Sequence, residues 1–92
     1  MNRNSTMNPE GSIELYRLLK EWDPLGLAAE DFDYDAEIYD SMEVLHSTRD
    51  VETAGRKIQQ IFLHSFEEEI PLAQIRPVAE EGLEIVELYK AP

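Results

Sequence analysis

The sequence contains no cysteine among its 92 residues. Disulfide bonds, zinc sites with thiolate ligands and cysteine nucleophiles are therefore excluded together. Basic residues are scarce as well, with 8 lysines and arginines against 20 aspartates and glutamates, and the formal net charge is −12 at pH 7. Because such a surface repels phosphate backbones and anionic lipids, we expect neither nucleic acid nor a membrane as a partner.

Long hydrophobic runs are also missing. No stretch approaches the roughly 20 apolar residues of a membrane-spanning helix. The first residues, MNRNSTMNPEG, lack the apolar segment of a secretory signal. Together with the lack of cysteine, these features favour a cytoplasmic location. The length suits one small domain, and 42% hydrophobic residues are enough to build its core.

Apolar residues at helical spacing predict an all-α fold, most clearly in a helix at residues 50–67. Its apolar residues share an arc of roughly 140° when successive residues are placed 100° apart. These residues are Val51, Ala54, Ile58, Ile61, Phe62 and Phe66. Asp50 is placed to accept a hydrogen bond from the first turn. We expect this helix to be central and to be contacted by all the others.

Three further helices are predicted at about residues 12–22, 34–47 and 71–89, each with an apolar stripe. The whole chain is then a compact four-helix bundle-like single domain over residues 12–90. Residues 1–11 are polar and are predicted to form a flexible tail.

Single residues indicate where these helices begin and how they pack. Ser12 is a predicted N-cap, and either Asp33 or Asp35 is expected to cap the helix at 34–47. Pro77 removes a backbone donor, so we expect a kink or a short break near it. Gly82 lies on the apolar side of its helix, where the missing side chain allows another helix to approach closely.

Acidic residues alternate with tyrosines before and within the helix at 34–47. The members of this cluster are Asp31, Asp33, Tyr34, Asp35, Glu37, Tyr39 and Asp40. Carboxylates can attract a basic protein, and tyrosine rings supply contact area at interfaces. We interpret the cluster as a partner-binding surface on which Tyr34 or Tyr39 is the anchor. The alternative is a solvated face whose tyrosines pack inward.

A metal site is the competing interpretation of this part of the chain. Glu43 and His46 form an E-x-x-H pair, and His64 and Glu67 offer the same residue types in reverse order. Di-iron bundles use two such pairs with all side chains pointing inward. Here His64 and Glu67 lie on the polar side of their helix, and Glu43 and His46 lie at an edge. We therefore predict no metal, no cofactor and no catalytic residue.

Several phrases together resemble a family of short bacterial proteins of unknown function, the DUF1871 family. They are LYRLLKEWDPL at 15–25, YDAEI at 34–38, KIQQIF at 57–62, and SFE at 65–67 followed by IPL at 70–72. The resemblance covers roughly residues 13–88. It implies an all-helical single domain from a bacterium and carries no established activity, so it assigns no functional residue.

These observations favour a small non-enzymatic protein that docks on a basic protein partner. One specific form is a toxin-neutralising inhibitor, by analogy of size, charge and fold class with acidic immunity proteins. The first alternative is a metal-dependent helical enzyme that uses Glu43 and His46. The second is a homo-oligomeric structural module that pairs through exposed Val44, Leu63 or Leu88.

Overall fold

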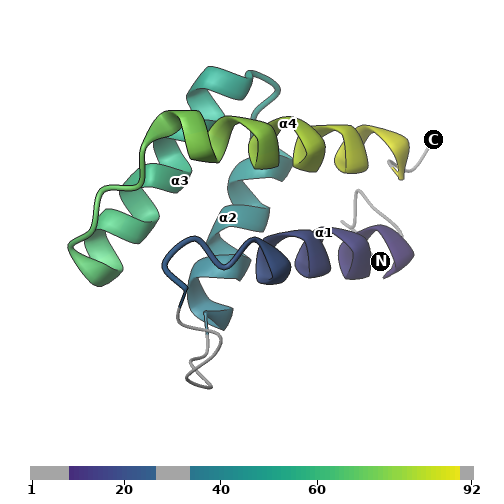
Figure 1. Ribbon diagram of the computed structural model, residues 1–92. Coiled ribbons are helices and arrows are strands. Elements are labelled where there is room, and N and C mark those ends of the chain that lie inside the picture. Colours follow the sequence, from purple (N-terminus) through teal and green to yellow (C-terminus); the bar gives the residue numbers. More distant parts are fainter. Residues whose placement is uncertain (1–8, 27–33, 90–92) are drawn as a thin grey trace.

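The computed structural model describes residues 9–26 and 34–89, which form four α-helices and their connections (Figure 1). The helices are α1 (Pro9–Trp22), α2 (Asp35–Ser47), α3 (Val51–Phe66) and α4 (Leu72–Leu88). No strand occurs within these two ranges. The prediction of an all-α fold with four helices is confirmed.

The helices pack as two crossed pairs rather than as four parallel rods. Figure 1 shows α1 and α4 side by side in opposite directions, with α2 crossing behind them and α3 beside α2. α2 and α4 each contact all three other helices, whereas no Cα atoms of α1 and α3 lie within 8 Å of each other. α1 reaches α3 through Trp22, whose ring lies 5.5 Å from that of Phe62. The helix predicted to be central is therefore less central than α2 and α4.

The start of α1 differs most from the prediction. α1 begins at Pro9, three residues before the predicted N-cap Ser12, and Gly11 is buried. A proline fits the first turn because its missing N–H would have no helical partner there. The prediction of a tail is therefore wrong for residues 9–11, which are helical, and residues 1–8 lie outside the described residues. The other predicted boundaries lie within one residue of those observed.

The two predicted caps of the next helices have different outcomes. Tyr34 occupies the N-cap position of α2 without a capping side-chain hydrogen bond, and Asp35 is already the first helical residue. Asp33 lies outside the described residues. Asp50 caps α3 as predicted, since its Oδ2 accepts hydrogen bonds from the backbone N–H of Thr53 at 2.8 Å and from its hydroxyl at 2.6 Å.

The predicted apolar stripes meet in one core. Its buried hydrophobic residues are Leu15, Leu19, Tyr34, Ile38, Leu45, Ala54, Ile58, Phe62, Ile70, Ile75 and Ala79. One polar residue, Ser41, is also fully buried, and its hydroxyl has no hydrogen-bond partner. A buried hydroxyl without a partner costs about 1–3 kcal/mol. Sequence patterning did not place Ser41 in the core, because a serine at a helical position is expected on the surface.

Gly82 marks the point where three helices cross. A Cβ atom at this position would lie 2.7 Å from Leu45 Cδ1 and 3.4 Å from Leu15 Cδ1. Both leucines are fully buried. The predicted close approach at Gly82 is confirmed, and the residue joins α4 to both α1 and α2.

Pro77 lies inside α4, and the helix runs through it without a break. The proline removes the hydrogen bond that the carbonyl of Ala73 would accept. Both residues are exposed, so water can bond to the carbonyl of Ala73 in place of the missing N–H. α4 continues through Pro77, and the predicted short break does not occur.

Aromatic side chains pack together at the end of the molecule where α1 and α3 end and α2 begins. The Tyr34 ring lies 6.1 Å from that of Phe62 and 5.9 Å from that of Phe66, and Trp22 meets Phe62 edge-on. The Tyr34 hydroxyl donates a hydrogen bond to Asp23 Oδ1 at 2.7 Å. Asp23 has a positive φ of 41°, an uncommon conformation for a residue other than glycine. The Tyr34 bond therefore helps to hold the turn that follows α1.

Alanine should have opposite effects on stability at Gly82 and at Gly55, two glycines inside helices. We expect Gly82→Ala to lower the free energy of unfolding by about 1 kcal/mol, because overpacking costs about 1–3 kcal/mol and outweighs a helix-propensity gain of about 1 kcal/mol. At Gly55 a Cβ would meet Leu72 and Ile75 at ordinary distances of 3.7 and 3.8 Å. Gly55→Ala should therefore stabilise the protein by about 0.5–1 kcal/mol. Urea unfolding of both variants tests this, and a stabilising Gly82→Ala would contradict it.

Replacing the unpartnered buried hydroxyl should stabilise the protein. We expect Ser41→Ala to raise the free energy of unfolding by about 1 kcal/mol, since it removes a desolvated polar group with little change in volume. The matched control on the same helix is Ser47→Ala. Ser47 is exposed, and its hydroxyl donates to the carbonyl of Glu43 at 2.9 Å, so a change within about 0.5 kcal/mol is expected. A destabilised Ser41→Ala variant would show that the hydroxyl has a favourable role.

Candidate functional site

The structure separates the seven residues of the predicted partner-binding surface. Asp31 and Asp33 lie outside the described residues. Tyr34 is only 4% exposed, and its ring packs against Phe62 and Phe66. The prediction that Tyr34 anchors a partner is therefore wrong, because its side chain is already used in the core.

The remaining members of the cluster differ in exposure. Asp35 is half-buried, and its Oδ1 accepts a hydrogen bond of 2.5 Å from the Tyr16 hydroxyl, which links α2 to α1. Glu37 is half-buried. Asp40 is exposed, and Tyr39 is 57% exposed. Tyr39 is thus the tyrosine of this cluster that is available to a partner.

Tyr39 belongs to an open apolar groove between α1 and α2, which we call the Tyr39 groove. It has a volume of about 270 Å³ and is lined by Ser12, Ile13, Tyr16, Tyr39 and Met42. The rings of Tyr16 and Tyr39 lie 5.8 Å apart, centroid to centroid. Ile13 is 56% exposed. The groove therefore presents an aliphatic and an aromatic side chain to solvent at one place.

Charge is distributed unequally along the two edges of the Tyr39 groove. α2 carries four carboxylates and no lysine or arginine; these are Asp35, Glu37, Asp40 and Glu43. α1 carries both signs, and its Lys20 ammonium lies 5.9 Å from the centroid of the Tyr16 ring. The α2 edge is thus the negative one, and it is the edge that would attract a cationic partner.

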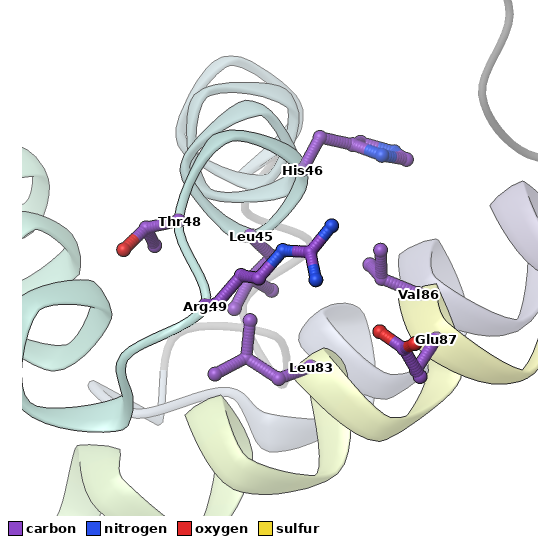
Figure 2. Close-up of a pocket in the computed structure, with 7 residues that line it drawn as sticks. All are labelled: Leu45, His46, Thr48, Arg49, Leu83, Val86 and Glu87. Atoms are coloured by element: carbon purple, nitrogen blue, oxygen red, sulfur yellow. The ribbon is translucent and has the colours of Figure 1, made fainter. Parts of the chain in front are cut away.

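A second concave site, the Arg49 pocket, lies where the end of α2 meets α4. It has a volume of about 250 Å³ and is lined by Leu45, His46, Thr48, Arg49, Leu83, Val86 and Glu87. Figure 2 shows the Arg49 side chain extended among the other lining residues, with its guanidinium between His46 and Val86. In this view Leu83 lies below the Arg49 side chain, and the Leu45 side chain overlaps that of Arg49. The pocket thus combines apolar walls with a cation and a carboxylate.

The residues of the metal hypothesis do not form a ligand cluster. His46 and Glu43 are both exposed, and His46 lines the pocket that also holds the Arg49 guanidinium. Within residues 9–26 and 34–89, no group of three histidines, aspartates or glutamates is arranged to hold a metal ion. A nearby guanidinium also repels a metal cation.

The apolar residues proposed for self-association differ in exposure as well. Leu88 is 79% exposed. Val44 and Leu63 are half-buried, and Val44 packs against the core, so the prediction of exposed Val44 and Leu63 is wrong.

In the part of the chain that the structure describes, no helix is both long and apolar enough to cross a membrane.

Comparison with known proteins places the chain in a family. The family model described as "Domain of unknown function (DUF1871)" matches residues 14–90. The chain belongs to the DUF1871 family. It is 35% identical over 66 residues to "Uncharacterized protein YugE" of Bacillus subtilis, across 72% of this chain and 74% of YugE.

A solved structure supports the fold of this DUF1871 member. A protein from Bacillus stearothermophilus with a crystal structure is 27% identical to it. The similarity has a TM-score of 0.80 and covers 88% of this chain and 98% of that protein. The resemblance that the phrases at 15–25 and 57–72 indicated is confirmed.

Neither Ile13 nor the Arg49 pocket is indicated by a pattern in the sequence. Ile13 lies off the apolar stripe of its helix, and an isolated exposed apolar residue carries no signal by itself. Arg49 stands out in the sequence as the single lysine or arginine between positions 30 and 55. Its placement beside α4 depends on the crossing of α2 and α4, which no local pattern encodes.

The Asp50 cap fixes the corner that carries Arg49, and its contribution should depend on pH. The hydroxyl of Thr53, and then its backbone N–H, lower the pKa of Asp50 below its ordinary value. A lowered folded-state pKa stabilises the protein above the unfolded-state pKa, and this stabilisation is lost as the pH falls through the folded value. We expect Asp50→Ala to lower the Tm at pH 7 and the difference from the wild type to shrink below about pH 4.

Thermal unfolding followed by circular dichroism at pH 7 and at acidic pH tests this prediction. Glu69→Ala is the control, because Glu69 is an exposed carboxylate outside the helices. A difference between wild type and Asp50→Ala that is equal at both pH values would contradict the role of the charged cap.

Proposed function

We propose that this DUF1871 protein is a non-enzymatic binding module that docks on a basic protein through the Tyr39 groove and its acidic α2 edge. The observation that carries this proposal is the exposure of Ile13 and Tyr39 in one groove. Three large hydrophobic residues are exposed in the described structure, and two of them line this groove.

The chemistry of the groove resembles that of an interface anchor. Tyrosine is enriched at binding hot spots because it combines a large apolar ring with a polar tip. Tyr39 has Tyr16 as a ring neighbour, and Tyr16 is itself held by Asp35. The hydrogen bond to Asp35 therefore fixes Tyr16 beside Tyr39, so this part of the groove is ordered before a partner binds.

Charge supports a basic partner rather than an acidic or neutral one. The net charge of −12 attracts a cationic protein over a distance of about a Debye length, and α2, which supplies Tyr39 and Met42 to the groove, carries four carboxylates. A small acidic protein of this kind is suited to cover the cationic substrate site of a nuclease. Inhibition of such an enzyme is the specific form of the proposal.

Affinity capture with full-length protein as bait, in an extract of cells that encode it, supplies the test. The partner is identified by mass spectrometry, and its affinity is then measured with purified proteins at low and high salt. We expect Tyr39→Ala to weaken binding at least tenfold. The double variant Asp40→Lys/Glu43→Lys should slow association and reduce its dependence on salt.

The matched control is Glu80→Lys/Glu81→Lys, which makes the same change in net charge at exposed positions of α4. It should bind more tightly than Asp40→Lys/Glu43→Lys, because its changed charges lie away from the groove. A partner that binds all of these variants with equal affinity would refute the proposed surface. Capture of a second copy of this chain alone would replace the proposal with the homo-oligomeric alternative.

A further inference from the structure

We infer that the Arg49 pocket binds a small monocarboxylate with a compact apolar body. The site shares no residue with the Tyr39 groove. The inference is therefore independent of the proposed protein partner, and either one can fail without the other.

Arg49 is conspicuous because it lies in the most acidic part of the chain and forms no ion pair with any described residue. Residues 30–52 contain nine acids, which are Glu30, Asp31, Asp33, Asp35, Glu37, Asp40, Glu43, Asp50 and Glu52. No carboxylate of the described residues lies within 4.0 Å of the Arg49 guanidinium, whereas Glu52 pairs with Arg76 at 3.0 Å and with Arg56 at 3.9 Å. The guanidinium of Arg49 instead extends over the pocket (Figure 2).

The lining of the pocket suits an amphipathic anion. A guanidinium recognises a carboxylate through two parallel N–H···O hydrogen bonds, and such charge-assisted bonds are stronger than neutral ones. Leu83 and Val86, which are both half-buried, supply apolar surface beside the guanidinium. A ligand whose charged end meets Arg49 could therefore place an apolar body against these two side chains.

Size and charge narrow the ligand class further. The volume of about 250 Å³ lies between the 150 Å³ or so that holds benzene and the 300 Å³ or more of sites for drug-sized molecules. A body of about six to ten non-hydrogen atoms fits this range. Glu87 forms another wall of the pocket, and its carboxylate together with the net charge of −12 opposes ligands with two or more negative charges. A monoanion is therefore favoured over a phosphate or a polycarboxylate.

Titration of the isotope-labelled full chain with sodium hexanoate, followed by backbone amide NMR shifts, tests the inference. We expect saturable shifts at residues 45–49 and 83–87. Acetate should bind at least fivefold more weakly because it lacks the apolar body, and hexylamine should not shift these amides because its charge has the wrong sign. The competing result is a set of shifts that grow linearly with concentration, which would mean a general salt effect and would overturn the inference.

Two arginine variants separate the pocket from general attraction of anions. Arg49→Gln should lose at least tenfold in hexanoate affinity while its Tm stays near that of the wild type. Arg56→Gln removes an exposed arginine on α3 and should bind hexanoate as the wild type does. Equal affinity of Arg49→Gln and Arg56→Gln would refute the assigned role of Arg49. Saturable shifts confined to residues outside the pocket would refute its location.

Discussion

The packing of this protein depends on the absence of a side chain at Gly82. The methyl groups of Leu45 and Leu15 occupy the space that a Cβ would need, so α4 can approach α1 and α2 closely. A glycine inside a helix costs about 1 kcal/mol, whereas a fully buried leucine contributes about 1.5–3 kcal/mol. The two leucines at the crossing outweigh this cost. The same crossing sets Leu83 and Val86 beside the end of α2 and thereby creates the Arg49 pocket.

Burial decides which of several similar residues are available for function. Tyr34 and Tyr39 are both tyrosines in an acidic stretch, yet Tyr34 is 4% exposed and Tyr39 is 57% exposed. The hydroxyl of Tyr34 bonds to Asp23, and that of Tyr16 bonds to Asp35. Asp35 is thus the member of the acidic cluster that accepts a tyrosine hydrogen bond, and its donor, Tyr16, lines the Tyr39 groove. The alternative of inward-packing tyrosines holds for Tyr34 but not for Tyr39.

The Tyr39 groove and the Arg49 pocket both depend on α2. Its middle turns supply Tyr39 and Met42 to the Tyr39 groove, and its last turn supplies Leu45 and His46 to the Arg49 pocket. The two sites differ in chemistry, since the first is apolar with an acidic edge and the second places a guanidinium against leucine and valine. A protein of 92 residues thus has two concave surfaces of different chemistry on one helix.

The sequence by itself determined the helices, their apolar faces, the Asp50 cap and the family, because each depends on residues close together in the chain or on a recognisable order of phrases. It also indicated that Gly82 lies at a close contact. Only the tertiary structure decided that Ser41 and Tyr34 are buried, that Ile13 lies beside Tyr39, and that Arg49 extends over Leu83. These facts depend on how helices distant in sequence cross, and helical periodicity states which face is apolar without stating which helix covers it.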